Sequence, residues 1–176
     1  MRRREQREVS QTVPNWCENE LTIVGARERL LAFYRQGKGP SPIQGEGESA
    51  LSADRFVPMP EEYTTAEGYD RYGYDWAIRN WGTKWGLQDV QIDPVDEELL
   101  TNTEFSSEAS SYLFYTFRTA WSPPDALIRA MAAQFPTLRF SLAYFETGMG
   151  FQGILVVEGV EVKADVTTDY GGDRGG

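Results

Sequence analysis

Histidine, cysteine, serine and carboxylate side chains carry most nucleophilic and acid–base chemistry in proteins. The chain of 176 residues contains no histidine and one cysteine, Cys17. Without histidine, neither Cys17 nor Ser122 has the usual base to activate it, and one cysteine can form neither an intrachain disulfide nor a cysteine metal cluster. The adjacent Glu18 also opposes formation of a thiolate. The composition therefore predicts a buried structural cysteine, no catalytic residue, no metal site and no cofactor.

Ligand binding is the chemistry suggested by one aromatic segment. A pocket around Lys84, with rings to stack on and a cation to hold an anion, would be built from Trp76, Asn80, Trp81, Thr83, Lys84 and Trp85. The alternative is that the rings belong to the core, because Tyr74, Ile78, Trp81 and Trp85 recur at helical spacing. In that case Asn80 and Thr83 cap the helix end and Lys84 is solvated, and the sequence favours this second interpretation.

Acidic residues dominate the charge of the chain, which is -10 at pH 7. Between Gly86 and Phe117 there is no lysine or arginine, whereas seven acids occur: Asp89, Asp93, Asp96, Glu97, Glu98, Glu104 and Glu108. Such a stretch repels nucleic-acid phosphates and would attract a protein with a basic surface. The other interpretation is that these acids only keep a small protein soluble.

The first eight residues have the opposite character, with four arginines and two glutamates. This segment is the only one suited to nucleic acid, which it would bind weakly and in a salt-sensitive way; the alternative is a solvated arm. The arginines are not followed by an apolar run, so they do not resemble a secretory signal. No apolar run approaches the roughly 20 residues of a membrane span, and we expect a cytoplasmic protein of a bacterial host.

The pattern along the chain predicts one domain. Strands are expected at 19–25, 88–92, 111–121, 138–145, 151–157 and 160–163, and helices at 26–36, from 74 to 82 or 85, and from 123 to 135 after Ser122 as N-cap. Residues 1–13 are predicted as a flexible basic arm and residues 165–176 as a flexible tail. The domain, residues 14–164, would contain an insertion at about 37–86 that begins with a Gly- and Pro-rich loop.

The order of these elements predicts the fold class, which is α+β. Strand, helix, insertion, two strands, helix and two further strands match the split βαβ plan of ferredoxin-like folds with an extra hairpin strand at the end. Helices should cover one face of an antiparallel sheet. With a single cysteine, an iron–sulfur cluster is excluded.

Four motifs together resemble a known family. They are Pro14–Thr22 (PNWCENELT), Asn80–Trp85 (NWGTKW), Thr119–Pro124 (TAWSPP) and Tyr144–Gly148 (YFETG) running on to Phe151–Gly153 (FQG). In this order they are similar to the YubB-like proteins of phages and conjugative plasmids, a family of unknown function. The resemblance implies a ferredoxin-like fold and an origin on a mobile element, and it implies no activity. The arginine-led segment before Asn15 and the long loop at 37–49 depart from the family pattern.

Function is therefore predicted by class only. We expect a non-enzymatic accessory protein, anti-defence or regulatory in role, that binds a protein partner with a basic surface through its acidic residues. A small-ligand sensor or enzyme using the Lys84 cluster is the first alternative. A nucleic-acid binder acting through residues 1–8 is the second. The sequence does not determine the oligomeric state.

Overall fold

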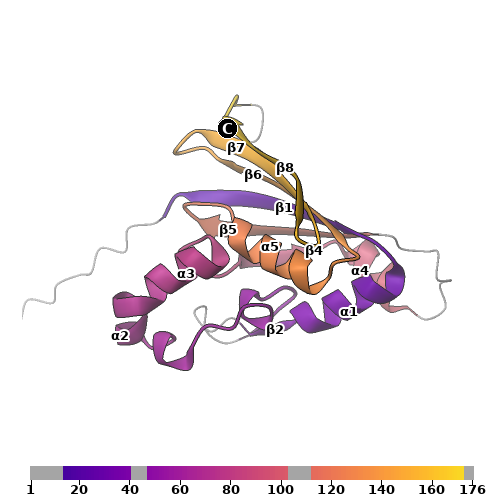
Figure 1. The fold of residues 1–176 in the computed structure, drawn as a ribbon, viewed down its shortest axis with the longest axis horizontal. Coiled ribbons are helices and arrows are strands. Elements are labelled where there is room, and N and C mark those ends of the chain that lie inside the picture. The colour runs from indigo at the N-terminus through magenta and orange to yellow at the C-terminus, as the bar shows by residue number, and fades with distance from the viewer. Residues whose placement is uncertain (1–13, 41–46, 103–111, 173–176) are drawn as a thin grey trace, which may run out of the picture.

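A computed structural model describes residues 14–40, 47–102 and 112–172 of the chain. The predicted basic arm at 1–13, and Glu104 and Glu108 of the predicted acidic surface, lie outside these residues. Figure 1 shows one sheet whose lower face carries the helices, while the strands nearest the C-terminus rise away from them.

The main sheet has six strands in the order β4-β5-β1-β6-β7-β8, and all neighbouring strands are antiparallel. Their bounds are β1 Trp16–Val24, β4 Gln88–Ile92, β5 Tyr112–Ala120, β6 Arg139–Glu146, β7 Phe151–Glu158 and β8 Glu161–Asp169. β1 lies in the middle, where Leu21 pairs with Tyr115 of β5 on one side and with Leu142 of β6 on the other. This arrangement confirms the predicted ferredoxin-like plan, because β5 separates β1 from the β4 strand that follows the first helix.

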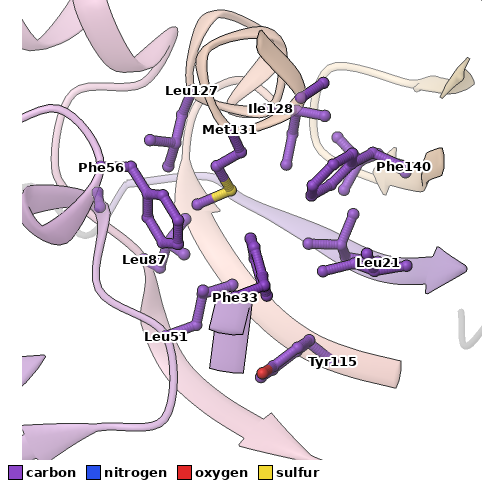
Figure 2. Close-up of a cluster of buried hydrophobic side chains, with 14 of the residues drawn as sticks. Leu21, Phe33, Leu51, Phe56, Leu87, Tyr115, Leu127, Ile128, Met131 and Phe140 are labelled. Carbon is purple, nitrogen blue, oxygen red and sulfur yellow. The ribbon is translucent and has the colours of Figure 1, made fainter. Parts of the chain in front are cut away.

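Alternation along the strands gives the sheet one apolar face, and the core lies between that face and the helices. Helix α1 (Arg27–Gly37) and helix α5 (Asp125–Gln134) pack on it with α3 (Tyr74–Trp81). Phe33 of α1 is fully buried and its ring contacts the rings of Phe56, Tyr115, Phe135 and Phe140. Figure 2 shows this cluster, in which Met131 of α5 points down toward Phe33.

The predicted insertion forms short elements that extend the helical layer. They are β2 Gly39–Pro40, β3 Glu48–Ser49, 3-10 turns at Ala53–Arg55 and Glu61–Tyr63, α2 Ala66–Gly68 and a π-helical turn at Tyr69–Gly73 that leads into α3. Helix α3 ends at Trp81 because Gly82 adopts a left-handed conformation, with φ at 84°. Of the two predicted ends of this helix, the glycine is therefore the correct one.

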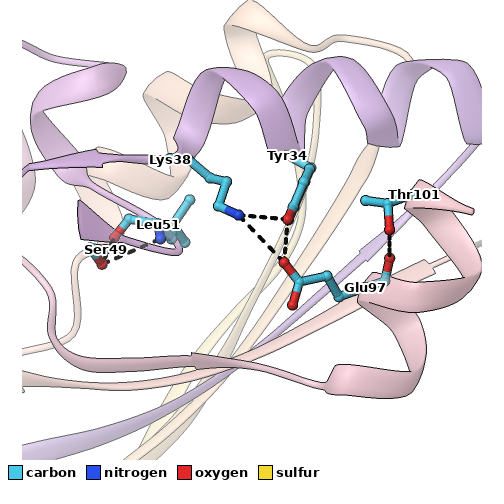
Figure 3. A network of polar contacts seen from close by, with 6 residues as sticks. All are labelled: Tyr34, Lys38, Ser49, Leu51, Glu97 and Thr101. Atoms are coloured by element: carbon cyan, nitrogen blue, oxygen red, sulfur yellow. Dashed lines mark hydrogen bonds and ion pairs between the residues drawn. The ribbon is translucent and has the colours of Figure 1, made fainter.

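A helix that the sequence did not predict follows β4. Helix α4 (Pro94–Thr101) begins at Asp93, whose carboxylate accepts hydrogen bonds from the backbone N–H groups of Val95 and Asp96. It is tied to α1 by Glu97, which accepts a hydrogen bond from the Tyr34 hydroxyl and lies 3.5 Å from the Lys38 ammonium. Figure 3 shows these three side chains converging between the two helices.

Two predicted boundaries are wrong. The tail was predicted to begin at residue 165, whereas β8 continues to Asp169, because its backbone pairs with β7 along the whole strand. Ser122 was expected as the N-cap of the last helix, but its hydroxyl donates to the carbonyl of Gly82 and α5 begins at Asp125. Within the described residues, no helix has the length and apolar character needed to cross a membrane.

Candidate functional site at one end of the open sheet face

The four sequence motifs meet at one end of the sheet. Thr83 donates to the carbonyl of Ala120 at 2.9 Å, which joins the second motif to the third. The backbone N–H of Trp121 donates to the carbonyl of Asn15 at 2.9 Å, which joins the third to the first. Gly148 lies so close to Asn15 that an added Cβ would come within 2.7 Å of its amide. Segments distant in sequence therefore build one local structure.

A hollow opens beside this junction on the face of the sheet without helices. It has a volume of about 610 Å³, which lies in the range of ligand-binding sites. Alternation places Trp16, Glu18 and Glu20 of β1 on this face, next to residues of β5 and β6. We call it the sheet hollow, and it is lined by Pro14, Asn15, Trp16, Glu18, Asn19, Glu20, Thr116, Arg118, Phe145, Glu146, Thr147 and Gly148.

Aromatic rings and cations form a continuous ladder along its edge. The guanidinium of Arg118 lies 5.2 Å from the centre of the Trp16 ring, and Trp16 in turn contacts Trp85 with ring centres 6.1 Å apart. The Lys84 ammonium lies 4.6 Å from the Trp85 ring. Arg118 also forms an ion pair with Asp89 of β4. Stacking and ion pairing together hold the guanidinium in place at the hollow.

Carboxylates give the hollow a negative balance. Burial raises the pKa of the Glu18 carboxyl; Arg118 opposes this rise and Asp89 adds to it. Glu146 is buried, and its carboxylate accepts hydrogen bonds from the backbone N–H groups of Gly148 at 2.7 Å and Met149 at 2.5 Å. Three glutamates thus line the hollow together with one arginine.

Backbone strain is found beside the same site. Among the described residues, Asp89 and Trp121 are the non-glycine residues with positive φ, at 47° and 72°. Such conformations are costly, especially for a bulky side chain, and they tend to cluster at functional positions. Asp89 lies where the β4–β5 register shifts and contacts Arg118. Trp121 is partly exposed and bonds Asn15.

The predicted tryptophan pocket is divided by the structure. Trp81 is fully buried, its indole N–H donates to the carbonyl of Val57 at 2.9 Å and its ring contacts Trp76 edge-on. Thr83 is buried too, and the Asn80 amide donates to the carbonyl of Trp76. Trp81 therefore belongs to the core, as the core interpretation predicted, whereas Thr83 bonds Ala120 of β5 and does not cap the helix end.

Lys84 and Trp85 are half-buried, and their contacts link them to the sheet hollow, so the assignment of Trp85 to the core is wrong.

The predicted acidic surface is also divided. Asp96 is only 4% exposed and accepts a hydrogen bond from the backbone N–H of Phe114, so its assignment to an exposed surface is wrong. Asp93 caps α4 and Glu97 joins α4 to α1. Asp89 lies apart from them beside the sheet hollow, and Glu98 is exposed on α4. The described acids of this stretch are thus mainly engaged within the fold.

Cys17 is fully buried on the helical face of β1, as predicted. Burial raises the pKa of its thiol to about 12, and the charges of Glu146 and Glu18 act in the same direction. Among the described residues, no three carboxylate or thiol side chains converge to hold a metal ion.

Sequence reasoning missed most residues of the hollow, namely Trp16, Glu18, Glu20, Thr116, Arg118, Phe145 and Glu146. The first motif contained the signal, because alternation along a strand puts residues 16, 18 and 20 on the face opposite Cys17 and Leu21. The partners of these residues on β5 and β6 depend on strand order, which a single strand does not specify.

Comparison with protein families agrees with the fold. The described architecture is that of a ferredoxin-like α+β domain. Residues 100–174 match the family described as the ferredoxin-like domain in Api92-like protein. A crystal structure of a protein api92 from Yersinia pseudotuberculosis is similar over 90% of this chain and 99% of that chain, with 12% identity and a TM-score of 0.49. None of the curated proteins matches the chain.

Proposed function

We propose that this chain is a non-enzymatic binding protein that contacts a protein partner through the sheet hollow. The observation that carries the proposal is the convergence of four separate motifs on one open, strained end of the sheet. An aromatic ladder and a ≈ 610 Å³ hollow lie there, on a face without helices. Exposed aromatic rings beside a pocket are typical of protein contact sites.

A partner with a basic surface would complement the negative charge of the chain and of the hollow. The chain carries a net charge of -10, and the hollow is lined by three glutamates and one arginine. Charge complementarity accelerates association and selects against acidic competitors such as nucleic acid. The negative contact surface is then the hollow with Asp89, rather than α4. As to setting, we propose an anti-defence or regulatory accessory protein of a phage or conjugative plasmid, acting in the bacterial cytoplasm.

The test is affinity capture from a bacterial host with the complete chain and two variants. Thr116→Arg puts a long side chain into the hollow and reduces its negative charge by one, whereas Thr168→Arg puts the same side chain on exposed β8, outside the lining of the hollow. We expect wild type and Thr168→Arg to retain a common partner that Thr116→Arg loses. With the purified partner, the association rate should fall steeply with added salt. Equal capture by all three proteins would refute the proposal.

A small-ligand sensor is the second candidate, favoured by the Lys84 ammonium over the Trp85 ring. This pair would take an anionic ligand with an apolar part. Screening small anions by tryptophan fluorescence, with Lys84→Met as the control, would test it. A ligand whose affinity is equal in wild type and in the variant would exclude this pair as the site.

A further inference from the structure

The sheet hollow already holds one guanidinium in a defined environment. Arg118 lies against the Trp16 ring and pairs with Asp89, and its neighbour Glu18 is partly desolvated. Arg118 pairs with Asp89, and the lining of the hollow carries three further acids, Glu18, Glu20 and Glu146, against this single arginine. A ligand that enters this hollow is therefore favoured if it carries a positive charge.

The walls favour a planar cation over a compact one. Phe145 lines the hollow, and its ring is held by stacking on Tyr170 with centres 5.6 Å apart. A guanidinium is planar, is weakly hydrated, stacks on aromatic rings and binds carboxylates with two parallel hydrogen bonds, whereas an ammonium is a strongly hydrated point charge. Rings and carboxylates lining one hollow therefore suit arginine better than lysine.

The volume of the hollow limits the size of the ligand that can carry the guanidinium group. Its volume of about 610 Å³ exceeds the space that one side chain needs, so it has room for a short length of chain around the basic residue. Resting on the proposed function, we infer that the sheet hollow takes an arginine side chain from a segment of the protein partner.

The experiment uses short peptides and the complete ¹⁵N-labelled chain. Acetyl-Gly-Arg-Gly-amide is titrated while the indole signal of Trp16 is followed, which is assigned by its loss in Trp16→Phe. Replacing arginine by citrulline keeps the shape and removes the charge. We expect the arginine peptide to give saturable shifts of this signal. The citrulline peptide should bind about tenfold more weakly, as for the loss of one charge-assisted hydrogen bond. A lysine peptide should bind with intermediate affinity.

Variants assign the binding to the hollow. The double change Glu18→Gln with Glu20→Gln should weaken binding of the arginine peptide by about tenfold or more, since it removes two carboxylates. Glu98→Gln, an exposed acid on α4, should leave it unchanged. Retained signal dispersion shows that a variant is folded, and Thr116→Arg provides a second, steric block.

Equal affinity for arginine and citrulline, or for wild type and the double variant, would overturn the inference even if a partner is captured. Conversely, the arginine peptide could bind selectively while Thr116→Arg still captures every partner that the wild type captures. That result would contradict the proposed function and leave the inference about arginine standing.

Discussion

Cys17 illustrates how burial determines the chemistry of a single residue. Its thiol is fully buried and its pKa is raised to about 12, so the reactive thiolate is scarce at neutral pH. We expect the folded protein at pH 8 to resist iodoacetamide and Ellman's reagent, and to react stoichiometrically in guanidinium chloride. Mass spectrometry of the alkylated protein measures this directly. Rapid labelling under native conditions would contradict the buried position.

Glu18 is expected to reduce the stability of the folded protein, because burial beside the hollow opposes the ionisation of its carboxyl. Its folded-state pKa is raised, so the folded chain holds this proton more tightly than the unfolded chain. Ionisation of Glu18 therefore costs stability above its folded pKa, and the cost vanishes below the unfolded value near 4.3. Glu18→Gln should raise the melting temperature at pH 7.

The gain from Glu18→Gln should shrink as the pH falls through the carboxylate range. Thermal melts followed by circular dichroism at several pH values measure it. Glu28→Gln, an exposed acid in the first turn of α1, is the control and should show no such pattern. A gain independent of pH would mean that packing, rather than charge, is responsible.

At the scale of elements, Arg27 fixes the end of α4. Its guanidinium donates to the carbonyls of Leu100 at 2.7 Å and Asn102 at 3.0 Å, which are oxygens that a helix end leaves without partners. Arg27→Ala should destabilise the protein by about 1.5–3 kcal/mol, because hydrogen bonds to a charged group are lost. Urea unfolding measures the change. Arg35→Ala, an exposed position on the same helix, should change stability by less than about 0.5 kcal/mol.

The elements were largely predictable where the local pattern is strong. β5, β6 and β7 were placed within a residue or two, since alternating apolar residues specify a strand with one buried face. Helix α4 was missed because Asp93 and the acids after it indicated charge more strongly than helical periodicity. Only the observed contacts of Asp93 and Asp96 show that these acids cap and anchor the helix.

At the scale of the whole molecule, the site was harder to predict than the fold. Trp16, Arg118 and Phe145 come from three strands, and their proximity depends on the order β5-β1-β6. The predicted ferredoxin-like plan implies that order, but no local periodicity gives the register that sets Glu18 opposite Arg118 and Phe145. Polar residues such as Glu18 also lack the apolar spacing by which sequence patterns are recognised. The four motifs nevertheless lie together at the end of the sheet where the hollow opens, although Trp81, one of the tryptophans chosen within them, belongs to the core.

Residues 100–174, which match the ferredoxin-like domain family, do not include β1, the strand that lies between β5 and β6 in the sheet. Without β1, both strands lose a hydrogen-bonded neighbour and Phe33 is absent from the core. We expect a fragment of residues 100–176 to show poor amide dispersion in NMR spectra and to aggregate, because unpaired strand edges promote association. The complete chain is the control. A well-dispersed, monomeric fragment would show that the segment folds alone.

The central place of β1 has a consequence for synthesis on the ribosome. Leu21 pairs with Tyr115 and Leu142, so β1 emerges long before either neighbour exists and waits unpaired while the intervening chain is translated. Pairings this distant along the chain slow folding. The sheet can close only after β6 has been made, and until then we expect the nascent β1 to be exposed to chaperones.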